Sequence, residues 1–282
     1  MTLLVFGQTG QVARALVSFE DVMCLDRRTT DLLYAERCAD VINAYQPATV
    51  INAAAYTHVH CAKLDETVAT VINGAALIAM EPTCAASKAA YVKISSDYTF
   101  DGSGHLPLAP YGATNPLSAH GFSKLKGEQG IHDAFEIYTS LRTARALLPF
   151  RYNFLKTMLL LLETRGTLSV VDYKVGGLTR AAAVAGTCHC KAQGLISKPG
   201  AAGIYYFSGA PEVSWASFAL ETFAQAHKPI MITPITSEEY FTPAKRPLNS
   251  QPDCVSLATQ FGISRPDWLI RLSSFLKELK VI

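Results

Sequence analysis

Three side chains able to act on a carbonyl group lie in the segment 92–128. Ser96 follows a strand-like run, and His120 and Lys124 stand four residues apart in a helix-like stretch, so they share one helical face. A hydroxyl at a strand end that faces an ammonium group and a ring is able to polarise a carbonyl. The segment therefore predicts a reactive site, which the rest of the chain must position.

The composition predicts an ordinary globular protein. Its 282 residues are 49% apolar and 17% charged, enough to bury a substantial core. The net charge of +2 and the lack of a strongly basic stretch argue against a nucleic-acid partner. Apolar runs such as 158–162 are far shorter than the roughly 20 residues of a bilayer span, so we expect no membrane association. Seven cysteines without framework spacing, and no visible secretory signal, indicate a cytoplasmic protein.

A glycine-rich turn opens the chain. Residues 2–6 form a buried-strand run, and GQTGQVA, from Gly7 to Ala13, leads into an amphipathic helical segment. In this context the pattern is typical of a dinucleotide site: Gly7 makes the tight turn, Gly10 admits a diphosphate and Ala13 allows close packing of helix on strand. An ordinary tight turn between a strand and a helix is the alternative interpretation.

The next strand-like run, 22–25, ends in Asp26, Arg27 and Arg28. An acid at this place accepts the ribose hydroxyls of NAD, whereas an arginine meets the additional phosphate of NADP. Both signals are present. The arginines favour NADPH, with NADH as the alternative.

Buried strands and helices alternate through residue 150, which predicts an α/β fold with a Rossmann-like, doubly wound parallel sheet. Ligands of such sheets bind at the carboxyl ends of the strands, where several distinctive residues fall: Gly7, Asp26, Ala54 and Ser96. We expect residues 1–150 to form an NAD(P)-binding domain and residues 151–282 a smaller substrate-binding lobe, with exchange of a strand or helix between them left open.

Helices are expected over the following ranges: 35–46, 66–80, 81–88, 153–164, 181–193, 215–227 and 268–280. Strands are expected at 168–171 and 204–207, and the tail from Thr242 reads as a loop. The stretch SGAPEVSW, 208–215, reads as a capped helix start. The clusters around His58 and Cys188 lack the spacing of a zinc site, so no metal is expected.

Five motifs together resemble the dTDP-4-dehydrorhamnose reductase family: GQTGQVA, VINAAAYT, SSDYTFDG, PLSAHGFSKLKGE and PAKRPLNS. The resemblance covers nearly the whole chain. It implies an extended short-chain dehydrogenase that reduces a 4-keto nucleotide sugar to dTDP-L-rhamnose with NADPH or NADH. It also leaves open a homodimer.

The resemblance assigns roles to residues of this chain. Ser96 falls where the family hydrogen-bonds the substrate carbonyl, and Lys124 where it binds the nicotinamide ribose and lowers a tyrosine pKa. The tyrosine that donates the proton is replaced by His120, so His120 or water bound to Tyr98 is left as the donor. Arg145 replaces a tryptophan of the family.

The predicted contacts follow from these assignments. The catalytic set is Ser96, Tyr98, His120 and Lys124. The cofactor is expected to contact Gly7, Thr9, Gly10, Gln11, Val12, Asp26, Arg27, Asp31, Ala53, Ala54, Ala55 and Lys124. The substrate is expected to contact Tyr98, Asn153 and Arg246, the last through its diphosphate.

Two functions are compatible with this pattern. The first is the NAD(P)H-dependent reduction of a 4-keto nucleotide sugar. The second is a dinucleotide-binding subunit of the same fold that regulates or partners another protein without catalysis. Position 120 separates them, because the family's chemistry requires a phenol there.

Overall fold

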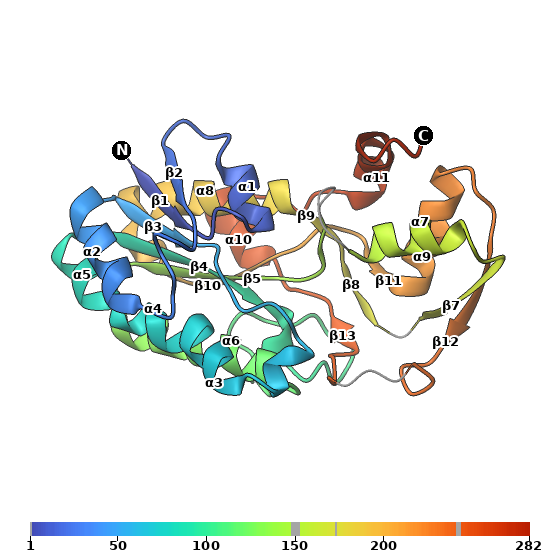
Figure 1. Cartoon of the computed structure of the whole chain (residues 1–282), viewed down its shortest axis with the longest axis horizontal. Helices are drawn as coiled ribbons and strands as arrows, with labels where there is room; N and C mark the ends of the chain where they lie inside the picture. The colour runs from blue at the N-terminus through green and yellow to red at the C-terminus, as the bar shows by residue number, and fades with distance from the viewer. Residues whose placement is uncertain (1, 148–152, 173, 241–243) are drawn as a thin grey trace.

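A six-stranded parallel sheet lies at the centre of the computed structural model, which describes residues 2–147, 153–172, 174–240 and 244–282 (Figure 1). The strand order is β10-β5-β4-β3-β1-β2. Its members are β1 (Leu3–Phe6), β2 (Val22–Leu25), β3 (Thr49–Asn52), β4 (Ala90–Ser96), β5 (Tyr138–Thr143) and β10 (Gly203–Phe207). Because β2 and β3 lie on opposite sides of β1, the chain reverses its direction of winding at β1, where such sheets bind ligands.

The apolar strands are buried on both faces, and alternate side chains enter different cores. In β1, Leu3 and Val5 pack into one hydrophobic cluster, while Leu4 and Phe6 pack into another. This is the pattern expected of a parallel sheet covered on both sides.

Helices cover both faces of the sheet (Figure 1). On one face lie α1 (Gln11–Leu16), α8 (Ala181–Ser197) and α10 (Val255–Phe261). On the other lie α2 (Ala35–Tyr45), α4 (Ala76–Ala79), α5 (Glu81–Ala86) and α6 (Ala119–Ala134), and α3 (Glu66–Thr70) packs against α6. The predicted doubly wound fold is confirmed.

Elements from the second half of the chain complete the sheet. Strand β10 pairs with β5 along five residues, and α8 packs against β3, β4 and α1. The predicted boundary at residue 150 falls within 148–152, outside the described residues. A cut at that point would separate the sheet from its outer strand.

The remaining elements form a smaller lobe beside the sheet's carboxyl edge (Figure 1). Its helices are α7 (Phe154–Leu162), α9 (Trp215–Gln225) and α11 (Trp268–Glu278), and their aromatic and aliphatic residues share one core. Its short strands are β6 (Ala146–Leu147), β7 (Thr167–Val171), β8 (Val175–Gly177), β9 (Thr179–Arg180), β11 (Glu212–Ser214), β12 (Met231–Ile235) and β13 (Asn249–Ser250).

Four elements of the second half differ from expectation. The stretch read as a capped helix start also contains β11, while α9 begins at Trp215 after the Ser214 N-cap, as expected. Strand β12 and helix α10 were not predicted, because β12 is largely exposed and only Leu257 of α10 is buried. The tail read as a loop contains β13; its first two residues, 242 and 243, lie outside the described residues.

The expected helix over 66–80 is interrupted by a π-helical turn at Val71–Ala75. The helical run 66–86 is long and apolar enough to cross a membrane by length and composition. Its residues Ala76, Leu77 and Met80 pack into a sheet core. We therefore read it as a core helix of the sheet domain.

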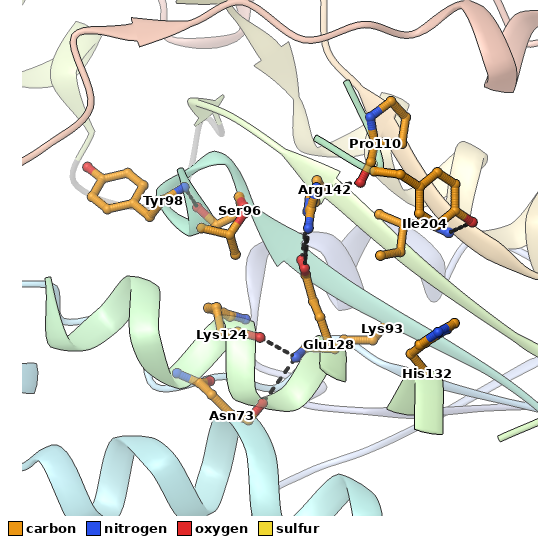
Figure 2. A network of polar contacts seen from close by, with 12 residues as sticks. Asn73, Lys93, Ser96, Tyr98, Pro110, Lys124, Glu128, His132, Arg142 and Ile204 are labelled. Carbon is orange, nitrogen blue, oxygen red and sulfur yellow. Dashed lines mark hydrogen bonds and ion pairs between the residues drawn. The ribbon is translucent and has the colours of Figure 1, made fainter. Parts of the chain in front are cut away.

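The π turn brings α6 close to β4. Asn73, inside the turn, accepts a hydrogen bond through its carbonyl from Lys93 Nζ at 3.1 Å, and Lys93 also donates to the Lys124 carbonyl at 2.9 Å (Figure 2). A Cβ on Gly127 would overlap both the Asn73 carbonyl oxygen and Lys93 Nζ. Only glycine therefore allows this contact, which fixes the height of α6 over the sheet.

We expect Gly127→Ala to lower the free energy of unfolding by about 1–3 kcal/mol, because the methyl group meets the Asn73 backbone. The matched control is Gly186→Ala in α8, where a Cβ meets no atom within 4 Å. The free energy of unfolding of this control should rise by up to about 1 kcal/mol, because alanine has a higher helix propensity than glycine. Urea unfolding measures both, and equal effects at the two positions would contradict the packing argument.

Candidate active site

A cavity of about 480 Å³ opens at the carboxyl ends of the central strands. Most of the predicted site residues line it: Gly7, Thr9, Gly10, Gln11, Val12, Arg27, Asp31, Ala53, Ala54, Ala55, Ser96, Tyr98, His120 and Lys124. Asp26, Asn153 and Arg246 are not among its lining residues. The fold thus brings together predicted site residues up to 117 positions apart in the sequence, from Gly7 to Lys124.

The glycine turn forms one end of the cavity. Gly7 has φ +94°, and a Cβ there would lie 2.7 Å from the Ala54 backbone nitrogen. Gly7 donates to the Leu25 carbonyl and its own carbonyl accepts from Gly10 at 2.7 Å, which closes the turn. A side chain at Gly7 would fill space that glycine leaves open. These residues therefore fit the diphosphate of a dinucleotide.

The acid and the base that follow β2 point to different partners. The Asp26 carboxylate accepts from Thr29, through the backbone nitrogen at 3.1 Å and the hydroxyl at 3.2 Å. Arg27 Nε pairs with Asp31 at 2.9 Å, and both residues line the cavity. Asp26 therefore stabilises its own turn, while Arg27 and Asp31 face the ligand space.

Ser96 is held by two neighbours in the 3₁₀ turn Asp97–Thr99 that follows β4. Its hydroxyl donates to Asp97 Oδ1 at 2.9 Å. It also accepts from the Tyr98 amide at 3.2 Å (Figure 2). Asp97 also lines the cavity and is 5% exposed. Sequence reasoning gave Asp97 no role, although its position between Ser96 and Tyr98 was the available signal.

His120 enters the site from the first turn of α6, which begins after the Ser118 N-cap. Its ring lies edge-on to Tyr98 with the centroids 5.6 Å apart. Within the described part of the chain, His120 Nδ1 is buried without a hydrogen-bond partner. Burial, and then the nearby Lys124 ammonium, lower the His120 pKa to about 4. The imidazole is therefore neutral near pH 7.

Lys124 lies one helical turn later, on the same face of α6. Its Nζ donates to the Ile94 carbonyl at 3.1 Å. Burial lowers the Lys124 pKa to about 8, and Glu128 opposes this shift. Lys124 thus keeps a charge near pH 7 beside a histidine that does not.

A buried ion pair supports this face of α6. Arg142 of β5 donates to Glu128 through Nε and Nη2, and through Nη1 to the Pro110 carbonyl at 2.7 Å (Figure 2). Both side chains of the pair are at most 2% exposed. Removing one partner would leave a buried charge unpaired, so the pair fixes α6 against β5.

The side of the cavity toward the lobe carries Arg145, whose backbone has φ +48°. Its guanidinium lies 4.3 Å over the Trp215 ring and donates to the Val213 carbonyl at 2.7 Å and to the Lys174 carbonyl. Burial lowers its pKa to about 10. Arg145 therefore joins the end of β5 to β11 and α9.

The three predicted substrate contacts are placed differently. Tyr98 lines the cavity, and burial raises its pKa while Arg246 opposes the shift. Arg246 Nη2 lies 3.1 Å from His60 Nε2. Asn153 is the N-cap of α7 and accepts from the Lys156 amide at 3.0 Å. Across the described residues, no three His, Cys, Asp or Glu side chains form a group able to hold a metal ion.

Comparison with known proteins agrees with this geometry. The family model described as "RmlD substrate binding domain" matches residues 1–281. The dTDP-4-dehydrorhamnose reductase of Sinorhizobium fredii strain NGR234 is 33% identical over 278 residues, covering 95% of this chain and 94% of the relative. The chain belongs to the dTDP-4-dehydrorhamnose reductase family. A second member, the dTDP-4-dehydrorhamnose reductase of Escherichia coli K12, is 30% identical over 293 residues, covering 99% of this chain and 98% of the relative.

Two solved members of the dTDP-4-dehydrorhamnose reductase family share the whole fold. The enzyme of Clostridium acetobutylicum superposes with a TM-score of 0.91 at 29% identity, and the match covers 99% of this chain and 100% of that one. The enzyme of Bacillus anthracis, solved in complex with NADP, superposes with a TM-score of 0.89 at 26% identity over the same shares. The predicted resemblance and fold are confirmed.

The environment of His120 predicts a pH-dependent stability. Its pKa is about 4 in the folded protein and about 6.5 in the unfolded chain, so the unfolded chain binds the additional proton as the pH falls. Stability should therefore decrease between pH 6.5 and pH 4. From pH 7 to pH 5 the wild type should lose about 2 kcal/mol more than His120→Gln.

Urea unfolding of both proteins at the two pH values measures this difference. The other histidines are common to both proteins and cancel. Equal losses in the two proteins would show that His120 titrates normally in the folded state.

Proposed function

We propose that the protein reduces a 4-keto nucleotide sugar of the dTDP-4-dehydrorhamnose type to the corresponding dTDP-L-rhamnose, with NADPH as the reductant. One observation carries the proposal: the glycine turn, Ser96 and Lys124 line a single cavity in a chain similar to named reductases over its full length. Turn, hydroxyl and ammonium come from three separate elements that only this fold brings together.

The residues around the glycine turn would hold the cofactor. Gly7 and Gly10 leave room for the diphosphate, and the Bacillus anthracis relative contains NADP. Arg27 lines the cavity where β2 ends, whereas the carboxylate of Asp26 is occupied by Thr29. This supports NADPH over NADH. When bound, the cofactor supplies the hydride that reduces the ketone.

The chain's own side chains would hold the reacting groups. Lys124 orients the nicotinamide ribose, and Ser96 binds the ketone oxygen. Tyr98, Asn153 and Arg246 would contact the nucleotide sugar. Arg246 is suited to the diphosphate because a planar guanidinium matches phosphate geometry. His60 Nε2 lies near one of its nitrogens, Nη2. The cytoplasmic location and a homodimer stay predictions.

A second candidate function has one observation in its favour. The family's phenol is replaced by a buried imidazole with a pKa of about 4, and a neutral imidazole is a weak acid. A protein that binds the dinucleotide without catalysis, as a regulatory or partner subunit, would tolerate that replacement. Both functions require cofactor binding, and only the first requires turnover.

Turnover separates the two functions. We expect the wild type to oxidise NADPH in the presence of dTDP-4-dehydrorhamnose, and His120→Tyr to raise kcat about 10²–10⁴-fold by restoring general-acid catalysis. Absorbance of the nicotinamide measures both rates. Gly7→Val is the control, because its side chain would meet the Ala54 backbone and should abolish binding. If the wild type and His120→Tyr both bind NADPH but neither turns over the substrate, only the second function remains.

Arg27 should decide the cofactor preference. Arg27→Gln removes a charge that would meet the ribose phosphate, so the Kd for NADPH should rise about tenfold or more. The Kd for NADH should change little, and Arg28→Gln, on the neighbouring residue, should leave both constants near those of the wild type. Isothermal titration gives the Kd of both cofactors for the wild type and for each variant. Equal weakening of NADPH and NADH by Arg27→Gln would contradict the assignment.

A further inference from the structure

Asp97 is a buried acid in the cavity to which the proposed function gives no role. Its two oxygens have separate partners: Oδ1 accepts from the Ser96 hydroxyl at 2.9 Å, and Oδ2 accepts from the Ser250 hydroxyl at 2.6 Å. Ser250 comes from β13, so the carboxyl joins the end of β4 to the smaller lobe. Asp97 is therefore held on both sides by groups that stabilise its charge.

Charged and titratable groups face Asp97 from the neighbouring elements. Arg145, which follows β5, favours the ionised carboxyl, while Tyr98 of the same turn and Tyr206 of β10 interact with its charge. Burial outweighs the hydrogen bonds and Arg145, and it raises the pKa of Asp97 above its usual value. The buried position thus favours the protonated form more than water does.

The hydrogen bonds of Ser96 can be counted. A hydroxyl has one proton to donate and two lone pairs to accept. An ionised carboxylate only accepts, so the Ser96 proton is directed at Asp97, and one lone pair takes the Tyr98 amide. In that state Ser96 offers the cavity only a lone pair. It is unable to donate to a ketone oxygen, which is also an acceptor.

Protonation of Asp97 reverses this arrangement. The carboxyl O–H then donates to the second lone pair of Ser96, and the Ser96 proton becomes free to point into the cavity. Every group keeps a partner: the Tyr98 amide and the Asp97 hydroxyl occupy the two lone pairs, and the substrate accepts the proton. Ser250 still donates to the other carboxyl oxygen.

We propose that Asp97 acts through Ser96 as the source of the proton in this reduction, in place of the phenol that position 120 lacks. The proposal rests on the proposed function. His120 is neutral and its Nδ1 has no partner among the described residues, so it does not fill this role near pH 7. Asp97 is a positioning residue in the ionised state and a proton source in the protonated one.

The step balances. Hydride transfer to the ketone carbon breaks the C=O π bond, whose electron pair moves to oxygen, while NADPH is oxidised to NADP⁺. The resulting alkoxide takes the proton of Ser96 Oγ, and Ser96 takes the proton of Asp97. The reaction ends with a secondary alcohol, an intact serine and an Asp97 carboxylate that faces Arg145. Solvent returns the proton before the next cycle.

The decisive measurement is the pH profile of kcat. The rate should fall as the pH rises through the pKa of Asp97, because the protonated form is required. Asp97→Asn should lower kcat about 100-fold at the acidic end and remove that falling limb, since a carboxamide supplies no proton. The KM for the sugar and the Kd for NADPH should remain within a factor of about three. Asp101→Asn, an exchange of the next acid in the segment, should keep the wild-type profile.

A second variant covers the case in which Asp97→Asn does not fold. Ser250→Ala removes a hydrogen bond that lowers the Asp97 pKa, so the falling limb should move to higher pH. A purely structural role for Ser250 would lower kcat without moving the limb. In His120→Tyr the phenol supplies the proton. Adding Asp97→Asn to that variant should therefore lower kcat less than tenfold.

The outcomes are distinguishable. Turnover by the wild type with an unchanged pH profile in Asp97→Asn or Ser250→Ala would overturn the role of Asp97 alone, and would leave Lys124 or Tyr98 as the donor. Absence of turnover in both the wild type and His120→Tyr would overturn the proposed function and this inference with it. A lost limb in Asp97→Asn together with a shifted limb in Ser250→Ala supports the proposal.

Discussion

The contact between α6 and β4 determines where His120 and Lys124 lie in the site. Lys93 is buried, so its Nζ donates to two carbonyls, one from the π turn and one from α6 itself. Gly127 lets the backbones approach, and the Arg142–Glu128 pair fixes the helix against the next strand. Because α6 is held in this way, His120 and Lys124 face the end of β4 rather than solvent. A reactive geometry thus depends on buried charges that take no part in chemistry.

Much of this arrangement follows from the sequence, because it depends on local patterns. Apolar runs with glycine between them predict the strands and the turn at Gly7, and a four-residue spacing predicts that His120 and Lys124 share a face. Other features depend on contacts between distant segments. The bond from Ser250 to Asp97 joins residues 153 positions apart, and no local pattern indicates it. Asp26 was placed at the cofactor by its position after β2, but its carboxylate bonds within its own turn.

The replacement at position 120 changes the electrostatics more than the shape. A phenol beside an ammonium group is driven toward its charged form, whereas an imidazole beside the same group is driven toward its neutral form. Burial contributes most to the lowered pKa of His120, and Lys124 lowers it further, whereas the same Lys124 would favour the charged form of a phenol. The consequence is a shift of acidity from the helix to the strand end, where a buried carboxyl already shares a hydrogen bond with the serine.

The turn at Gly7 illustrates how such a change is tolerated. Its conformation is set by backbone space, and a side chain of any kind would meet Ala54. Position 120 is instead an ordinary helical residue whose side chain alone reaches the cavity. In the proposed function, room for the cofactor's diphosphate therefore depends on backbone space at Gly7, whereas the acid at position 120 depends on one side chain of α6. A single substitution at position 120 changes the acidity of that side chain and leaves the backbone space at Gly7 as it is.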